Sequence, residues 1–447
     1  MRRSRFWILG GALLGAGLVS NDAWAGDAPK REMPDYSGRA EEPASAGDIA
    51  LWVPRVLLFP FFAVTNYLIR WPLGVAIAGA ERAGIPGYLY DFFFFGPNHK
   101  AGIAPLAFVD FGFNPSVGIF AFWDNVAGSG HDLGFHGTAW VGGWLAGAAY
   151  DRIHLNGGDT LTLGALGIRR PDHVFYGIGP RSLQHDQSRY GSDQLEASLT
   201  YDIHLWRASR LQTRVGIRSV DLYHGHFGGD PSLEARAATG AFAIPSAFNR
   251  GYTAEFNHAL AALDSRCPRP APGSGVRVEA EAEHGTDVRH DAGGGWIRYG
   301  GTAAGFLDVD GLNRVLSLSL TAQFADPLGN EAIPFTELVS LGGIGPMRGY
   351  FPGRLVDRSG TAATVHYRWP IWVWLDGSLQ AAVGNVFGEH LDGFKPSLLR
   401  FSGAVGIESV GAPDNSLELL VGFGSETFLQ GGKVDSLRIA VGTNRGF

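Results

Sequence analysis

The residues with the most distinctive chemistry in this chain lie in one glycine-rich stretch, residues 337–358. The stretch carries a central tripeptide and three further charged side chains, Arg348, Gly349, Tyr350, Arg354, Asp357 and Arg358. Its five glycines and two prolines are incompatible with a helix or a central strand, so we predict a long loop. A buried guanidinium needs a carboxylate or several carbonyl groups as partners, because burial of an unpaired charge is costly. The chemistry that Arg348 predicts is therefore ion pairing.

Motifs for nucleophilic or zinc-dependent catalysis are missing from the sequence. It contains neither a Gly-x-Ser-x-Gly nucleophile elbow nor a His-Glu-x-x-His zinc motif. His284 and His290, near Glu283 and Asp287, could hold a metal, but we expect a solvated loop there. We therefore predict no enzyme, no cofactor and no metal. A barrel-wall enzyme, with Ser, His and Asp or Asn on neighbouring strands, stays open as an alternative.

The segment that follows the loop alternates between apolar and polar residues. Residues 364–369 place Val365, Tyr367 and Trp369 on one face and polar side chains on the other. This period of two is typical of a strand with one apolar face. In a soluble sandwich the polar face would meet water, and in a membrane barrel it would line the lumen.

The same alternation recurs along the chain, in residues 195–205, 276–283, 316–324, 417–423 and 437–441. Charged residues make up only 18% and glycine accounts for 65 of 447 residues, a composition typical of lipid-facing strands. We therefore predict an all-β fold, a transmembrane antiparallel barrel of about sixteen strands. The first five strands are expected at residues 101–112, 116–125, 132–142, 144–155 and 159–170, and the last five near 361–371, 377–387, 398–408, 415–424 and 436–447. A net charge of −7 gives no electrostatic reason to expect nucleic acid as a partner.

An ordered series of motifs in and after the loop is similar to a known family. The series is Gly342-Gly343, Arg348-Gly349-Tyr350, Gly353-Arg354, Asp357-Arg358-Ser359, Tyr367-Arg368-Trp369-Pro370 and Gly384-Asn385-Val386-Phe387-Gly388. It resembles the BamA/TamA family of outer-membrane barrels, the bacterial surface antigen family. The resemblance implies that the loop folds into the lumen, that its arginine contacts acidic lumen residues, and that the twelfth of sixteen strands follows it. It also implies a role in inserting or moving proteins, or lipids, at the outer membrane.

Two positions depart from the family pattern in a way that affects the loop. His366 stands where the family has a Glu, and Ala382 stands where it has an Asp. Another acid must then pair with Arg348. The candidate lumen partners are Glu279, Glu281, Glu283, His366, Glu408 and Glu418. We expect Arg348 to hold the loop in place rather than to act in transport.

Two smaller groups of residues carry weaker expectations. Arg354, Asp357 and Arg358 are expected to form a local charge cluster that shapes the loop. Residues 174–180 contain a Phe-Tyr-Gly-Ile-Gly run that also resembles a family segment. For that run we prefer the simpler interpretation, an aromatic girdle followed by a turn.

The N-terminal part is typical of an exported protein. Three arginines precede an apolar core, and Ala23-Trp24-Ala25 is a small-residue cleavage site, although a retained anchor is an alternative. We predict a signal peptide over residues 1–25, a flexible linker over 26–46, a short amphipathic helical periplasmic segment over 47–95 and an outer-membrane barrel over 96–447. The part before the barrel is too short for the periplasmic repeat domains of the family, so the resemblance covers the barrel alone.

The C-terminus is typical of an outer-membrane barrel, and the expected location and partners agree with this interpretation. Phe447 lies in phase with the apolar face of residues 437–441 and looks like the terminal aromatic signal by which outer-membrane barrels are inserted. The expected location is the bacterial outer membrane. The expected partners are outer-membrane lipids, the assembly machinery with this chain as its client, and unfolded outer-membrane proteins. The single Cys267 excludes an internal disulfide.

The physical basis for such a function would be a weak seam between the first and the last strand. A seam with few hydrogen bonds could open to lipid and template an incoming strand. Gly102, Gly442 and Gly446 near the two ends of the barrel permit such a seam. The alternatives are a passive pore or structural barrel without insertase activity and, third, a barrel-wall enzyme.

Overall fold

A computed structural model of the 447-residue chain describes residues 56, 59, 63, 67, 71–84, 88, 92–267, 272–290, 294–372, 375–410 and 416–444. The predicted signal peptide and linker, together with Gly446 and Phe447, lie outside the described residues. The predicted periplasmic segment is described only in part, where it contains helix α4 (Trp71–Arg82). Pro72 stands in the first turn of α4, where a proline does not interrupt the helix.

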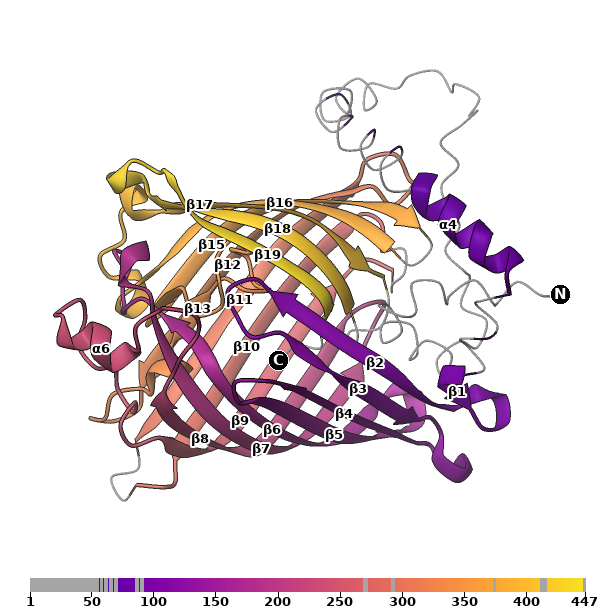
Figure 1. Ribbon diagram of the computed structural model, residues 1–447, viewed down its shortest axis with the longest axis horizontal. Helices are drawn as coiled ribbons and strands as arrows, with labels where there is room; N and C mark the ends of the chain where they lie inside the picture. Colours follow the sequence, from indigo (N-terminus) through magenta and orange to yellow (C-terminus); the bar gives the residue numbers. More distant parts are fainter. Residues whose placement is uncertain are drawn as a thin grey trace.

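Sixteen antiparallel strands close into one barrel (Figure 1). In chain order they are β2 (Ala101–Asp110), β3 (Ser116–Trp123), β4 (His131–Trp140), β5 (Trp144–His154), β6 (Thr160–Phe175), β7 (Ser188–His204), β8 (Arg210–His224), β9 (Tyr252–Asp264), β10 (Gly275–Asp287), β11 (Gly295–Asp308), β12 (Val315–Pro327), β15 (Ser359–Trp372), β16 (Leu375–Phe387), β17 (Arg400–Ser409), β18 (Ser416–Thr427) and β19 (Val434–Asn444). Each strand pairs with the next, and β19 pairs with β2. The predicted all-β barrel is confirmed, with β15 as its twelfth strand directly after the glycine-rich loop.

Short elements lie in the connections between the barrel strands. They are β1 (Phe94–Phe95), η3 (Pro97–His99), η4 (Val126–Gly128), η5 (Asn156–Gly158), η6 (Gln184–Asp186), α6 (Leu233–Ala238), η7 (Phe335–Glu337), β13 (Val339–Leu341), β14 (Leu355–Asp357), η8 (Glu389–Leu391), η9 (Pro396–Leu398) and η10 (Phe428–Gln430). Helix α4 and β1 lie at one end of the barrel and α6 at the other (Figure 1). Within the described part of the chain, no helix is long and apolar enough to span a membrane.

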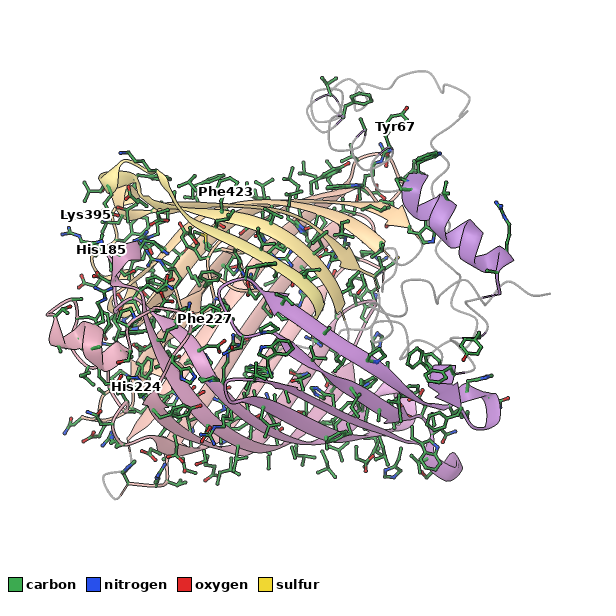
Figure 2. All side chains as sticks on the ribbon, viewed as in Figure 1. Tyr67, His185, His224, Phe227, Lys395 and Phe423 are labelled. Atoms are coloured by element: carbon green, nitrogen blue, oxygen red, sulfur yellow. The ribbon has the colours of Figure 1, made fainter. Side chains whose placement is uncertain are left out.

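Alternation of side chains decides which face of each strand meets lipid. On β12, Leu318 and Leu320 are 56% and 59% exposed on the outer face, whereas Ser319 between them points inward. Phe423 on β18 likewise projects from the outer side of the wall (Figure 2). Because successive residues of a strand point to opposite faces, a local sequence pattern is enough to form one wall of the barrel. The inward side chains and the glycine-rich loop together fill the lumen.

Candidate functional site: a plug loop beside the barrel seam

The connection between β12 and β15, residues 328–358, folds back into the lumen; we call it the plug loop. Its strands β13 and β14 pair with each other, with Ser340 opposite Val356 at the centre. Met347, Tyr350 and Leu355 of the loop are fully buried. They form one cluster with Leu341 of the loop, Ala362 of β15, and Ala382 and Val386 of β16. The loop is therefore an integral part of the barrel core, as the family resemblance implied.

Arg348 in the plug loop pairs with two glutamates on neighbouring strands. Its Nη2 donates a hydrogen bond to Oε1 of Glu418 on β18 at 2.6 Å. Its Nη1 lies 3.6 Å from Oε2 of Glu408 on β17. Both glutamates were among the six candidate partners from the sequence. They stand one to three strands further along the wall than His366 on β15 and Ala382 on β16, the positions at which the family resemblance placed the acids.

The other candidate partners make different contacts. His366 lies with Nε2 3.0 Å from Oγ of Ser378. Glu279 pairs with Arg277 on the same strand, and Glu281 accepts a hydrogen bond from Gln323. Glu283 pairs with Arg298 and Arg218. These three glutamates stand on β10, five strands from β17 and six from β18 in the barrel order.

Gly349 and Tyr350 fix the loop backbone against β17, β18 and β19. The Gly349 amide donates to Oγ of Ser402 at 2.9 Å, and its carbonyl accepts from Oγ of Ser436 at 3.1 Å. A Cβ at Gly349 would lie 2.0 Å from the carbonyl oxygen of Phe423, so only glycine permits this approach. The hydroxyl of Tyr350 donates to the carbonyl of Ser425 at 2.6 Å. The tripeptide predicted from the sequence is thus held by the strands next to the seam.

A second anchor of the plug loop lies at Glu337, which sequence reasoning missed. Glu337 is 2% exposed, and its Oε1 accepts from Nη1 of Arg218 at 2.9 Å and from the hydroxyl of Tyr252 at 2.6 Å. Nη1 of Arg298 lies 3.5 Å from its Oε2. Burial raises the pKa of the Glu337 carboxyl, but Arg298, Arg218 and the Tyr252 hydroxyl outweigh it, so the pKa is below its usual value. Two inward-facing arginines, Arg218 on β8 and Arg298 on β11, were the signal in the sequence that could have revealed this site.

The charge cluster expected from Arg354, Asp357 and Arg358 does not form. Arg354 donates to Oγ of Ser182 at 2.7 Å, and its guanidinium carbon lies 4.5 Å from the ring centre of Tyr176. Burial, together with Arg400, lowers the pKa of Arg354 to about 10. The reason for the separation is that residues 355–357 are extended as β14, which carries the side chains before and after it apart.

Arg358 and Asp357 are neighbours at the end of the loop, but the Arg358 guanidinium pairs with acids outside the loop. Arg358 donates to Oδ1 of Asp326 at 3.1 Å and to Oε2 of Glu389 at 2.9 Å. Burial raises the pKa of Asp357, although its carboxylate accepts a hydrogen bond from the Arg358 amide. Asp326, Glu389 and His390 are the group within the described residues that could hold a metal ion. Arg358 already supplies the positive charge that two of these groups need.

Residues 174–180 are part of the plug rather than an aromatic girdle, which corrects the simpler interpretation. Phe175 and Tyr176 are 2% and 1% exposed, so neither ring faces lipid. The Gly179 amide donates to the carbonyl of Val356 in the plug loop at 3.0 Å. Val174 and Tyr176 pack with Phe351 of the plug loop, and Phe175 packs in a second cluster with Phe335, so both faces of the run are covered.

Among the described residues, the seam between β19 and β2 has the fewest residue pairs of any contact between neighbouring barrel strands. It consists of three residue pairs, which are Ala440 with Asp110, Val441 with Val109 and Gly442 with Phe108. One additional backbone bond joins the Phe111 amide to the Ile439 carbonyl at 2.9 Å. By contrast, β7 and β8 pair continuously from Tyr190–His224 to His204–Arg210. A gap beside the short contact of β2 with β19 is visible in Figure 1.

One buried ion pair crosses the seam, and sequence reasoning missed it. Nη2 of Arg438 on β19 lies 2.9 Å from Oδ2 of Asp110 on β2, and Nε of Arg438 is 3.0 Å from the same oxygen. Nη1 of Arg438 donates to the carbonyl of Gly343 in the plug loop at 2.6 Å and contacts the Arg348 carbonyl at 3.3 Å. The plug loop and the seam therefore share one guanidinium.

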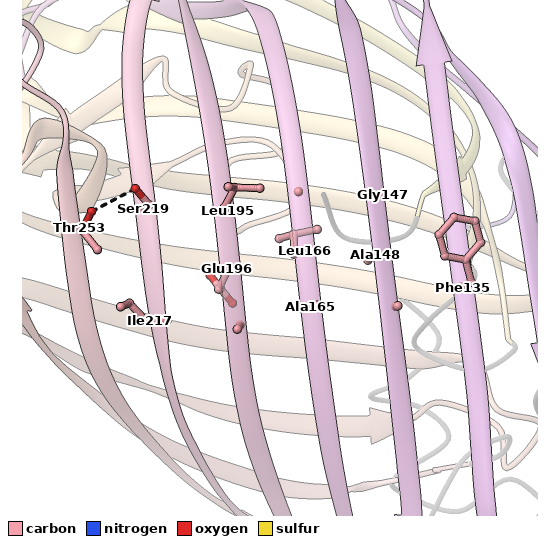
Figure 3. Close-up of a pocket in the computed structure, with 13 residues that line it drawn as sticks. Phe135, Gly147, Ala148, Ala165, Leu166, Leu195, Glu196, Ile217, Ser219 and Thr253 are labelled. Atoms are coloured by element: carbon pink, nitrogen blue, oxygen red, sulfur yellow. Dashed lines mark hydrogen bonds between the residues drawn. The ribbon is translucent and has the colours of Figure 1, made fainter.

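A depression in the barrel wall lies away from the plug loop. It runs across β5, β6 and β7, where the small residues Gly147, Ala165 and Ala197 line the outer face (Figure 3). Exposed Phe135 and Leu195 flank it on the lipid side. Within it, Oγ of Ser219 and Oγ1 of Thr253 lie 3.0 Å apart.

These features define a class of membrane protein, the transmembrane barrel whose lumen is filled by an ion-paired loop of its own chain. The loop tip rests on the strands that end at a short seam, so plug and seam form one site. Residues 159–406 match the Omp85 superfamily domain. The chain belongs to the Omp85 superfamily, and this membership implies the bacterial outer membrane as its location.

One solved structure supports the barrel fold of this chain, and a second is similar at a lower score. BamA from Haemophilus ducreyi lacking POTRA domains 1–3 is 12% identical, with a TM-score of 0.54 over 77% of this chain and 70% of that one. CdiB from Acinetobacter baumannii is 10% identical, with a TM-score of 0.45 over 76% of this chain and 60% of that one. The comparison with curated proteins gave no match.

Proposed function

We propose that this barrel inserts or moves proteins at the outer membrane by opening sideways at the β19–β2 seam. The observation that carries the proposal is the seam itself, which joins the two strands by three residue pairs around Val109 and Val441. Backbone pairing is the main cohesion between neighbouring barrel strands, so a short contact costs the least to separate. Lateral opening there would leave every other strand pair intact.

The edge of β2 beside the seam suits an incoming strand. Among the described residues, β2 pairs on this side with β19 from Phe108 and with β1 at Ala101 and Gly102. Residues 103–106 between these contacts pair with neither strand, which leaves backbone donors and acceptors available on one edge. An exposed strand edge binds an extended peptide by adding it to the sheet. The proposed partner is therefore an unfolded, strand-forming outer-membrane protein.

The remaining expectations become part of the same proposal. The chain is exported through a cleaved signal peptide, is inserted by the assembly machinery as its client, and contacts outer-membrane lipids through its apolar wall. It has no enzymatic role in this scheme. Helix α4 lies on the periplasmic leaflet, and the exposed Trp71 and Val75 on one side of that helix support this placement.

The first experiment is reconstitution of the mature protein in liposomes. The folding of a separate, unfolded barrel protein is followed by its gel mobility shift, with liposomes that hold an unrelated barrel as the reference. We expect faster folding in the presence of this chain. Equal folding rates would reduce the chain to a passive or structural barrel, which ion conductance would then characterise.

A disulfide across the seam tests whether client folding requires the seam to open. In a Cys267→Ser background, Val109→Cys with Val441→Cys places two thiols on directly opposed residues of the seam, a separation that suits a disulfide. We expect oxidation to abolish the acceleration of client folding and reduction to restore it. The matched control locks a continuous pair, Ala261→Cys with Ala280→Cys on β9 and β10. Loss of activity in both locks would show that the seam is not the gate.

A further inference from the structure

Arg438 occupies a position where three separate structures meet. It belongs to the last strand, its carboxylate partner Asp110 belongs to the first, and its carbonyl partners Gly343 and Arg348 belong to the plug loop. The side chains of Arg438 and Asp110 are 2% and 7% exposed. All of these contacts lie on the luminal side of the seam, directly behind the backbone pair that joins Ala440 to Asp110.

The contacts of the Arg438 guanidinium make two movements interdependent, the separation of β19 from β2 and the withdrawal of the plug loop. Separation of β19 from β2 removes the carboxylate of Asp110 from Arg438. Withdrawal of the plug loop removes the two carbonyl oxygens from the same side chain. Either movement alone leaves a buried charge with part of its partners, and that state is costly because the group has lost water without replacing it.

We infer that Arg438 is a positioning residue that couples the plug loop to the seam, so that release of the loop favours opening of the seam. The inference deepens the proposed function and rests on it for its purpose. Its test does not, because it measures the seam itself and requires no client protein. The neighbouring ion pair of the loop tip, Arg348 with Glu418, joins the loop to β18 rather than to either strand of the seam. It therefore offers a way to loosen the loop from outside the seam.

The seam can be observed through one amide. The Phe111 amide donates to the Ile439 carbonyl across the seam at 2.9 Å, so its hydrogen exchange reports how often the seam opens. The experiment measures this exchange, resolved to the residue, in the full-length protein in nanodiscs. Four proteins are compared: the wild type, Arg348→Ala, Arg438→Gln and the double variant. An amide in the β7–β8 wall serves as the internal reference.

The coupling predicts a non-additive result. Arg438→Gln should raise Phe111 exchange about tenfold or more, the factor expected when a charge-assisted contact is lost. Arg348→Ala should raise it severalfold in the wild type and have no further effect when Arg438 is already replaced. Equal effects of Arg348→Ala in both backgrounds, or no effect in either, would overturn the inference.

Two further variants keep the test informative if a single replacement disturbs folding. Arg368→Gln removes a comparable inward arginine, which pairs with Asp376 between β15 and β16, and should leave Phe111 exchange unchanged. The swap of Asp110→Arg with Arg438→Asp restores an ion pair across the seam but cannot donate from β19 to the loop carbonyls. We expect the swap to slow exchange towards the wild-type rate while Arg348→Ala no longer affects it. Continued sensitivity of the swapped protein to Arg348→Ala would contradict coupling through Arg438.

Discussion

The plug loop is attached to the barrel wall at two places, and the charges are arranged in opposite ways. At β8 and β11 the loop supplies an acid, Glu337, to arginines of the wall, Arg218 and Arg298. At β17 and β18 the loop supplies a base, Arg348, to glutamates of the wall, Glu408 and Glu418. The loop therefore carries both signs of charge, and each sign selects one side of the lumen.

The two anchors differ in what remains when the loop leaves. Around Glu337, three wall arginines and two wall glutamates already pair with one another, namely Arg214, Arg218, Arg298, Glu196 and Glu283. Loss of the loop acid there leaves each arginine with a carboxylate. At the other anchor the loop arginine is the printed ion-pair partner of Glu418, a buried wall glutamate, so its loss leaves that charge without this guanidinium. We infer that the Glu337 anchor is tolerant and the Arg348 anchor is not.

The largest effect is expected from Arg348→Ala. Removal of one member of a buried ion pair costs about 3–5 kcal/mol, because the remaining charge stays desolvated. Glu418, which is 5% exposed, would be in that position. The free energy of unfolding in urea, measured on the protein in lipid vesicles, tests this expectation, and limited proteolysis shows whether the plug loop is released.

The matched control for this variant is an exposed ion pair of the same chemistry. Arg169 and Asp193 lie 3.7 Å apart with side chains 59% and 46% exposed, so Arg169→Ala should change stability by less than about 1 kcal/mol. The double variant Arg348→Ala with Glu418→Gln should recover part of the loss, since it removes the stranded charge. A loss no larger than that of Arg169→Ala would show that the two anchors do not differ as described.

A smaller effect is expected from Gly349→Ala, which tests the same anchor sterically. The new methyl group would lie 2.0 Å from the Phe423 carbonyl oxygen, so the loop tip must move away from β18. We expect a loss of about 1–3 kcal/mol, the usual cost of overpacking. Gly305→Ala on β11 is the control, because nothing lies within 4 Å of a Cβ at that position. Unchanged stability of Gly349→Ala would mean that the tripeptide does not need its close contact with β18.

Sequence reasoning succeeded where the deciding property is local. The alternation of apolar and polar residues predicted strands at 101–112 and 144–155, and the structure has them at Ala101–Asp110 and Trp144–His154. The breakers around Arg348 predicted the loop for the same reason, since glycine and proline act on their own backbone. Six candidate partners for Arg348 could be named because inward residues alternate. Which of them meets the loop depends on the closed barrel.

Sequence reasoning failed where the deciding contact joins distant parts of the chain. Glu337 and Arg218 are 119 residues apart, and Arg438 and Asp110 are 328 residues apart. Only closure of the barrel brings the second pair together, since its members stand on the last and the first strand. The family pattern placed the acids for Arg348 at positions now held by His366 and Ala382, and it gave no indication that β17 and β18 would supply them.

The smallest effect is expected at the tolerant anchor, and pH makes it visible. Glu337→Gln keeps the shape of the side chain but removes its charge, which should cost about 1–2 kcal/mol at neutral pH. The arginines hold the pKa of Glu337 below its ordinary value of 4.5, despite the opposing effect of burial. A carboxyl group with a lowered pKa in the folded state stabilises the fold above its unfolded pKa. That contribution is lost as the pH falls through the folded value.

The stability difference between the wild type and Glu337→Gln should therefore be constant between pH 7 and about pH 5 and shrink below about pH 4.5. Urea unfolding of both proteins at matched pH values measures it, and titration of the other carboxylates cancels in the difference. A difference that persists undiminished at pH 3 would mean that the carboxylate is not held by Arg218 and Arg298. A neutral-pH loss as large as that of Arg348→Ala would remove the distinction between the two anchors, because the wall glutamates Glu196 and Glu283 would then not compensate for the lost acid.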